Sequence, residues 1–461
     1  MTYAPPPADM PRCPGPSMQD LLKTEGEAVP AVLQEESYVD YGDEPVAVER
    51  YTSREFHDRE VEKMWRKVWQ MVGRVEQIPN IGDHLVYEVA DDSLIVTRTS
   101  ETEIKAYYNA CLHRGTRLRD EGGHVQAFRC PFHGFTWGLD GTLKGVPCRW
   151  DFPALKDEDF RLPEARVATW GGFVFINMDP QCVPLEEYLG DICRHFEAWP
   201  LEQRYLAAHV SKIVHANWKV AQEAFMEAYH VPDTHPQFEA VIGDWNGQYD
   251  VYPGGHSRVY HSIYVPSPRM TQSGRTEISE QDIADMSAQI LGLDKTLEVP
   301  AGQTTRQALA QKYRLMLETK TGAKLSGYTT TEMLDLCSYF VFPNFFPWAG
   351  FGSPLLYRFR PNGNDPDSCI MEVMLLAPRP ENGECPAPAQ HRRLRPEEAW
   401  ADADELGGGR AAVFDQDTAN MPRIQAGLKT TRKPGLTLAR YQEVRIRHMH
   451  HVLDQYLNAP G

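Results

Sequence analysis

The chain has 461 residues, which is long for a single hydrophobic core and predicts two domains or one domain embedded in another. Its 47 basic and 64 acidic residues give a net charge of −17, which repels phosphate backbones and argues against nucleic acid as a partner. No stretch approaches the roughly 20 apolar residues that span a bilayer, and the first residues lack the basic and apolar regions of a secretory signal. We therefore expect a cytoplasmic protein with no membrane partner.

The first third of the chain changes character twice. Residues 1–45 are rich in proline and acidic side chains and are predicted to form an extended arm. A helix is expected from Ser53 to Val68. From 82 to 175 short alternating strands follow, with a hairpin turn at Asp140-Gly141, and together with the preceding helix they predict a compact antiparallel β domain over 46–178. The strands are expected at 85–89, 93–97 and 104–108.

Two short segments inside this β region combine cysteine with histidine. They read Cys111-Leu112-His113-Arg114-Gly115 and Cys130-Pro131-Phe132-His133-Gly134. With nine cysteines and sixteen histidines in the chain, each spacing is expected about 0.3 times by chance. The odd number of cysteines and a reducing compartment argue against a disulfide framework, so the pattern favours metal binding.

Two metals suit this ligand set. Two cysteines and two histidines can hold tetrahedral zinc, but zinc fingers usually pair like residues, whereas each segment here carries one of each. The mixed arrangement is typical of a Rieske 2Fe–2S cluster, in which two cysteines bind one iron and two histidines bind the other. We favour the Rieske cluster and keep structural zinc as the alternative.

The remainder of the chain, 179–461, is predicted to be a mixed domain. A helix is expected from Trp218 to Tyr229, ending near Pro232, and a helical insert from 265 to 330. Within the insert, Ser279–Asp282 has a capping-box pattern and a second helix covers Thr305 to Thr319. Later features are strands at 336–342, 355–360 and 369–377, a proline-rich loop at 378–396, a break at Gly407-Gly408-Gly409 and a final helix at 438–457.

A second candidate metal site lies at the end of the first of these helices. On a helix Glu227 and His230 share a face, and His235 lies just beyond, where the chain can fold back. Two histidines and a carboxylate that leave coordination positions open are typical of ferrous oxygenases. Two histidines at this spacing are expected about 0.5 times by chance, and His230 could simply cap the helix, so the prediction depends on the neighbouring cluster site.

Together these motifs resemble the α subunits of Rieske non-haem iron ring-hydroxylating oxygenases, from about Trp65 to Leu428. The resemblance is carried by 111–118 with 130–141, by 217–235 and by 414–428. It implies an α+β fold, with an antiparallel β Rieske domain and a helix-grip-like catalytic domain that combines an antiparallel sheet with helices. It also implies that Cys111, His113, Cys130 and His133 hold the cluster.

The resemblance further implies a mononuclear non-haem Fe(II) on His230 and His235, completed by a carboxylate from a late helix. Spacing to Gln425-Ala426-Gly427-Leu428 favours Asp417, and Asp415 is the alternative. Either residue could instead be a helix N-cap.

In that family an acidic residue three before the first iron histidine bridges to a Rieske histidine of a neighbouring subunit. Glu227 holds this position, where aspartate is common in ring dioxygenases and glutamate occurs in relatives that oxidise quaternary amines. An asparagine often found about four residues earlier is replaced here by Glu223 or Ala224. The resemblance implies a head-to-tail homotrimer, with or without a small β subunit, that receives electrons from NAD(P)H through a ferredoxin or flavin reductase.

The implied function is a terminal oxygenase that uses O2 to dihydroxylate or monooxygenate a hydrophobic, aromatic substrate. An O- or N-demethylase or quaternary amine monooxygenase is the alternative within the family, and a Rieske electron carrier without oxygenase activity is the alternative outside it. Candidate substrate contacts are Phe225, Met226, Phe342 and Trp348, although ordinary core packing explains any one of them as well.

Overall fold

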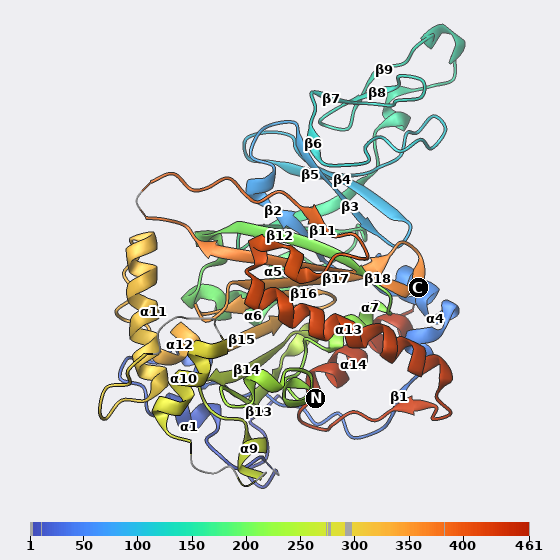
Figure 1. The fold of residues 1–461 in the computed structure, drawn as a ribbon. Helices are drawn as coiled ribbons and strands as arrows, with labels where there is room; N and C mark the ends of the chain where they lie inside the picture. The colour runs from blue at the N-terminus through green and yellow to red at the C-terminus, as the bar shows by residue number, and fades with distance from the viewer. Residues whose placement is uncertain are drawn as a thin grey trace. The chain divides into compact units, whose positions relative to one another are not determined.

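The computed structural model describes residues 3–10, 12–272, 274, 278–290, 297–381 and 383–460. It divides into two compact units, one formed by Met1–His57, Leu189–Arg360 and Pro366–Pro460, the other by Asp58–Tyr188 and Pro361–Asp365. Both units mix helices with largely antiparallel sheets, so the predicted α+β class is confirmed (Figure 1). None of the described helices has the length and apolarity needed to cross a bilayer, and neither Cys111 nor Cys130 is part of a disulfide.

The unit around Asp58–Tyr188 contains a seven-stranded antiparallel sheet and a three-stranded one. The three strands predicted from the sequence are present as β3, β4 and β5, and Asp140-Gly141 forms the turn between β8 and β9, with Gly141 at φ 76°. The helix predicted from Ser53 is present as α4 (Arg54–Glu60), followed by a π-helical turn (Val61–Trp65). In sheet order the strands are β2 (Gln70–Arg74), β11 (Phe173–Asn177), β10 (Glu164–Trp170), β5 (Ile104–Tyr108), β4 (Asp92–Arg98), β3 (Asp83–Val89) and β6 (Gly123–His124), and in the small sheet β7 (Ala127–Arg129), β8 (Thr136–Gly138) and β9 (Leu143–Gly145).

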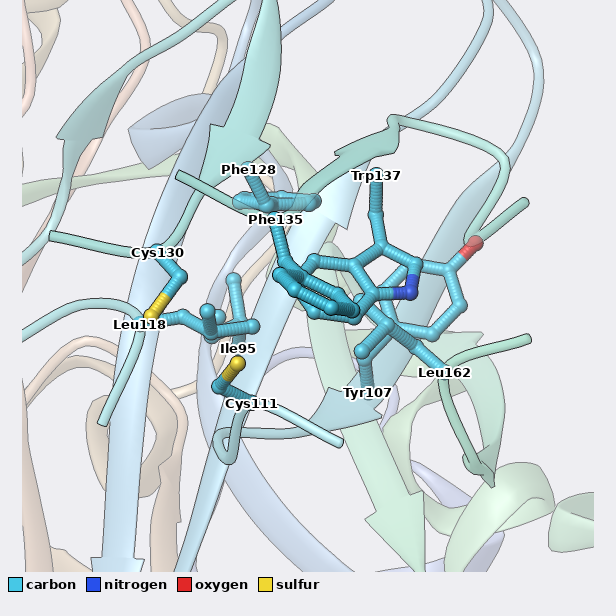
Figure 2. Close-up of a cluster of buried hydrophobic side chains, with 9 residues drawn as sticks. All are labelled: Ile95, Tyr107, Cys111, Leu118, Phe128, Cys130, Phe135, Trp137 and Leu162. Atoms are coloured by element: carbon cyan, nitrogen blue, oxygen red, sulfur yellow. The ribbon is translucent and has the colours of Figure 1, made fainter. Parts of the chain in front are cut away.

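A buried aromatic cluster ties the small sheet to the large one within this unit. Trp137 of β8 and Tyr107 of β5 are fully buried at one end of the cluster, whereas the sulfurs of Cys111 and Cys130 lie at the other (Figure 2). The Trp137 indole N–H donates to the carbonyl of Phe160 at 2.7 Å, which satisfies its polar edge in the core. The two cysteine-bearing loops are therefore anchored on a rigid hydrophobic base.

The second unit is built on an eight-stranded sheet. Helices α10, α11 and α12 gather at one side of this sheet (Figure 1), and the predicted capping box is present, with Ser279 and Asp282 exchanging side chain–backbone bonds. In sheet order the strands are β13 (Ile242–Val251), β14 (Ser257–Ile263), β15 (Leu336–Phe340), β16 (Phe345–Ala349), β17 (Leu355–Asn362), β18 (Asp365–Pro378), β12 (Arg204–Val214) and β19 (Arg392–Arg393), and the helices include α9 (Pro268–Gln272), α10 (Glu280–Ile290), α11 (Thr305–Thr321), α12 (Thr330–Leu334), α13 (Gly408–Thr430) and α14 (Val444–Asn458).

Two segments differ from their predicted form. Residues 3–45, expected to be an extended arm, carry α1 (Met18–Leu22) and α2 (Ala31–Gln34), and the Gln19 amide donates to Gln248 of β13 at 2.8 Å. The final helix begins at Val444 and not at 438, because the Arg447 guanidinium binds the carbonyls of Leu438 and Ala439 and holds that stretch outside the helix.

Candidate metal centres and their cavity

The two Cys/His loops of the smaller unit have the same backbone geometry. In the first, Cys111 N–H donates to the Thr116 carbonyl at 2.8 Å and Gly115 N–H donates back to the Cys111 carbonyl at 2.8 Å. In the second, Cys130 and Gly134 make the corresponding bonds at 2.8 and 3.1 Å. Gly115 and Gly134 have φ of 79° and 78°, a left-handed conformation that glycine adopts without strain. The glycine after each histidine therefore closes a tight loop that projects one sulfur and one imidazole.

The side chains of these loops converge. The rings of His113 and His133 lie 4.7 Å apart, and both sulfurs are buried. Burial raises the pKa of the Cys111 thiol, whereas at Cys130 backbone N–H donors from His133 and Phe132 outweigh burial and lower the pKa. Amide donors aimed at sulfur stabilise thiolate, and the buried Nδ1 of His113 has no hydrogen-bond partner. This donor set fits a cluster that takes two thiolates and two neutral imidazoles.

The helix expected to carry Glu227 and His230 is shorter than predicted. Helix α7 (Trp218–Glu223) ends before them, and His230 immediately precedes the short α8 (Val231–Thr234). The backbone between the two helices is bound from outside: the Met226 carbonyl accepts from Arg445 at 2.9 Å, and Ala228 N–H donates to the Tyr249 hydroxyl at 3.0 Å. These tertiary bonds replace the bonds of a continuous helix, so Glu227 and His230 meet through a loop and not across a helix face.

Three predicted ligands converge in the larger unit. Ligand atoms of His230, His235 and Asp417 all lie within 4.8 Å of one another. The Asp417 carboxylate is 2.8 Å from Nε2 of His235 and 3.5 Å from Nε2 of His230. Asp417 lies in the middle of α13 with its side chain buried, so it is not a helix cap.

Each imidazole is oriented by a residue outside this trio. Glu227 accepts from Nδ1 of His230 at 2.7 Å and from the His230 N–H at 3.0 Å. Gln416 lies 2.8 Å from Nδ1 of His235, a contact that the sequence analysis missed because no spacing rule connects residues 181 positions apart. With both Nδ1 atoms engaged, both Nε2 atoms point at Asp417, which is how supporting residues orient metal-binding histidines.

The charges of this site favour a cation between the side chains. Burial alone would lower the pKa of His230, but the carboxylates of Glu227 and Asp417 reverse this and raise it to about 10. Burial raises the pKa of Asp417, but its bonds to His230 and His235 lower it below the ordinary value. A site that holds a proton this strongly also suits a divalent metal, which takes the place of that proton.

The alternative ligand, Asp415, lies elsewhere. Its carboxylate accepts the backbone N–H groups of Trp400 and Ala401 at 2.8 and 3.0 Å, which caps the 3-10 helix Trp400–Asp402. Asp415 therefore acts as a helix cap, but the helix that it caps is Trp400–Asp402 and not α13, to which Asp415 itself belongs.

A cavity of about 590 Å³ opens beside the trio. Its lining is mainly apolar and comes from the loop after α7, from one face of strands β13 to β17 and from the start of α13. Of the four candidate substrate contacts, Phe225 and Trp348 line this cavity. The other two candidates lie outside its lining: Met226 is fully buried, and Phe342 is buried and stacks on Tyr456 with the ring centroids 5.6 Å apart.

Glu227 also lines a second cavity, of about 480 Å³. Glu223 lines it and accepts from the Tyr51 hydroxyl at 2.9 Å, with Nε2 of His450 also at 2.9 Å. Burial raises the pKa of Glu223 to about 8. Glu223 is therefore a largely buried carboxyl group that contacts both a tyrosine and a histidine.

Another trio, formed by His209, Glu372 and His391, also brings candidate ligands together. Arg358 binds the Glu372 carboxylate through two nitrogens, at 2.6 and 2.7 Å, so its charge is already balanced. The two imidazoles stack face to face with the centroids 3.9 Å apart, which keeps their in-plane lone pairs parallel and not convergent. This trio is a structural network in the sheet.

Family models match two parts of the chain. The model described as the ring hydroxylating alpha subunit (catalytic domain) matches residues 191–459, and the Rieske 2Fe-2S domain model matches residues 68–156. Among curated relatives, the chain is 32% identical to the biphenyl 2,3-dioxygenase subunit alpha of Rhodococcus jostii (strain RHA1) over 40% of this chain and 42% of that protein. It is 29% identical to the carnitine monooxygenase oxygenase subunit of Escherichia coli (strain K12), over 43% of this chain and 57% of that protein. The matches thus span about half the length of these relatives.

Solved structures share the fold at lower identity. A quaternary ammonium Rieske monooxygenase in complex with L-carnitine aligns with a TM-score of 0.63 at 18% identity, covering 89% of this chain and 95% of that one. Naphthalene 1,2-dioxygenase from Rhodococcus sp. aligns with a TM-score of 0.60 at 21% identity, covering 90% and 95%. Since the catalytic-domain model covers more than half of the sequence, the chain belongs to the ring-hydroxylating alpha-subunit family and carries a Rieske 2Fe-2S domain.

Proposed function

We propose that the chain is the terminal component of a Rieske oxygenase, which uses O2 to oxygenate a molecule that carries a hydrophobic aromatic ring. The observation that carries this proposal is the convergence of His230, His235 and Asp417 beside a largely apolar cavity. Two imidazoles and one carboxylate on one side of a metal leave positions free for O2. We propose that these three residues hold Fe(II), and that Cys111, His113, Cys130 and His133 hold the cluster.

The chain's own residues would position the reaction and exclude water. Glu227 and Gln416 fix the ring orientation of the two histidines through their Nδ1 atoms. Phe225 and Trp348 offer aromatic surfaces against which a flat substrate can pack. The iron, when bound, supplies the activation of O2 that no side chain can provide.

Electron supply is the second half of the proposal. His133 and the neighbouring Phe132 are exposed at the tip of the second Cys/His loop, where a ferredoxin or flavin reductase fed by NAD(P)H can approach. Glu227 binds His230 and also lines the second cavity, which is where a neighbouring subunit can reach it. We propose a cytoplasmic head-to-tail trimer, with or without a small β subunit, in which Glu227 bridges two metal sites.

The decisive experiment measures metals and O2 incorporation together. The purified protein is expected to contain iron and sulfide, to show the coloured spectrum of a 2Fe–2S cluster and to form product labelled from 18O2. His230→Ala should abolish product formation while the cluster spectrum persists. A colourless protein with zinc and no sulfide contradicts the cluster, and a His230→Ala variant that retains its function supports the electron-carrier alternative.

A further inference from the structure

Three residues that line the cavity each have a buried polar atom without a hydrogen-bond partner. His261 of β14, Ser338 of β15 and Trp348 of β16 all line the cavity, and they are 8%, 3% and 9% exposed. The buried Nδ1 of His261, Oγ of Ser338 and Nε1 of Trp348 have no hydrogen-bond partner. Buried polar groups of this kind are normally paired, so three on one surface indicate a ligand or ordered water.

The sheet register makes these three residues one group. Ser338 and Trp348 are directly opposite each other in the β15–β16 pair. Val259 is opposite Ser338 and His261 is opposite Leu336 in the β14–β15 pair, so His261 is the diagonal neighbour of Ser338 on the same face. His261, Ser338 and Trp348 therefore form one polar patch in the mainly apolar cavity lining. All three residues lie on strands and not on loops.

A buried guanidinium contacts the backbone of this patch. Arg445 is fully buried and donates to the Ser338 carbonyl at 3.5 Å, the Ser257 hydroxyl at 3.0 Å and the Met226 carbonyl at 2.9 Å. Burial lowers the pKa of Arg445 to about 9, which leaves it protonated at neutral pH. Across the described part of the chain, no carboxylate lies within ion-pair distance of Arg445, and Asp250 is paired with Arg258 at 2.6 Å.

Among the described residues, the cavity lining also lacks a free carboxylate that could bind a cation. Of the described residues, Glu227 and Asp417 are the only carboxylates that line it, and both are bound to imidazoles. The indole N–H of Trp348 can only donate, the Ser338 hydroxyl can donate, and Arg410 adds a guanidinium at the start of α13. An uncompensated buried cation next to unused donors favours an anionic oxygen.

We propose that the ligand of this cavity is an aromatic carboxylate, whose anionic oxygens bind the His261–Ser338–Trp348 patch while its ring extends toward the metal trio. This proposal rests on the proposed oxygenase function and specifies its substrate class. It predicts that aromatic acids bind this cavity more tightly than quaternary ammonium compounds or unsubstituted hydrocarbons do.

Binding of matched probes to the iron-loaded protein tests the proposal. Isothermal titration calorimetry without O2 compares 2-naphthoate with 2-naphthamide, and phenanthrene-9-carboxylate with its amide, because acid and amide share shape but not charge. We expect the acid of at least one pair to bind ten times or more tighter than its amide. Equal binding of acid and amide in both pairs, no binding of either acid, or tighter binding of the trimethylammonium analogue overturns the proposal.

Two conservative variants connect this preference to the patch. Ser338→Ala and Trp348→Phe each remove one donor and keep most of the packing, so each should reduce the ratio of acid to amide affinity several-fold. Trp400→Phe is the matched control, because it removes a buried, unpartnered indole N–H outside the cavity lining, and it should leave the ratio unchanged. A ratio that stays constant in both patch variants overturns the assignment.

The same samples separate this proposal from the oxygenase function. If iron and cluster are present and a hydrocarbon is oxygenated but acids gain no affinity, the substrate class is wrong and the function stands. If acids bind preferentially but no ligand gives 18O-labelled product, the patch is supported and the oxygenase function is wrong.

Discussion

The Oε1 atom of Gln416 lies 2.8 Å from Nδ1 of His235, and the next residue along α13, Asp417, approaches Nε2 of the same ring at 2.8 Å. Two consecutive residues thus contact both nitrogens of one imidazole. Asp417 is the proposed ligand and Gln416 fixes the ring and its tautomer, so α13 positions the metal and one of its histidines together.

Gln416→Ala should weaken iron binding at the mononuclear site. Loss of a partner that orients a ligating histidine costs about 10–100-fold in metal affinity or activity. Iron affinity is measured by titration of iron-depleted protein, with the cluster spectrum as an internal reference. Gln237→Ala is the control, because Gln237 contacts Gln416 but not the ring. An iron affinity of Gln416→Ala equal to that of the wild type would show that the ring needs no support.

Asp417→Ala and Asp415→Ala should fail in different ways. Asp417→Ala is expected to lose the mononuclear iron and product formation while it keeps the cluster. Asp415→Ala should keep the iron and lose about 1 kcal/mol of stability, because a helix cap on Trp400 and Ala401 is removed. Iron analysis and thermal unfolding of both variants check this, and loss of iron from Asp415→Ala alone would reverse the assignment.

Glu227→Gln should keep both metals and slow product formation by about 10–100-fold. The amide retains an oxygen that can accept from His230 but loses the charge that supports the imidazole and, in the proposed trimer, its bridge to the neighbouring subunit. Single-turnover experiments that start from reduced cluster measure the step directly. Unchanged turnover at full iron content would remove Glu227 from the electron route.

Glu223 should make stability depend on pH. Burial raises its pKa from 4.5 to about 8 in the folded protein, so between these values the folded state holds a proton that the unfolded state has released. This contribution is complete below pH 4.5 and is lost as the pH rises through 8, with a slope of at most about 1.4 kcal/mol per pH unit.

Glu223→Gln should remove this component. Urea unfolding of the metal-loaded protein at several pH values between 5 and 8.5 measures the slope, and Glu186→Gln, at an exposed position, is the control. A parallel pH profile in wild type and Glu223→Gln would contradict the raised pKa.

Gly134→Ala should damage the cluster loop more than Gly115→Ala. Both positions require left-handed φ, which costs a residue with a Cβ about 1–2 kcal/mol. At Gly134 the added carbon would also lie 3.1 Å from the Arg129 guanidinium and 3.3 Å from the Pro147 ring, whereas at Gly115 it meets no atom within 4 Å. Cluster absorbance and melting temperature compare the two, and equal effects would mean that backbone strain alone matters.

The sequence by itself predicted the chemistry that local spacing encodes. Each Cys/His loop is formed by residues that are close together in the sequence. The ligand residues and the glycine that closes each loop could therefore be recognised from their spacing, and the loops have the expected form. Strands β3, β4 and β5 were recognised because they are short runs rich in β-branched and aromatic residues. Strands β13 and β14 were missed because they are buried on both faces and contain charged residues such as Asp250 and Arg258, which pair with each other, so neither strand has an alternating or continuously apolar sequence.

Only the tertiary structure decided what distant segments do to one another. Arg445 and Tyr249 bind the backbone after α7 and stop a helix that its local sequence favours, which moves Glu227 and His230 into a loop. Contacts with Trp400 and His235 distinguish Asp415 from Asp417, although both are aspartates two residues apart on one helix. The patch of His261, Ser338 and Trp348 exists only because strand register aligns three separate strands, and no sequence spacing records that register.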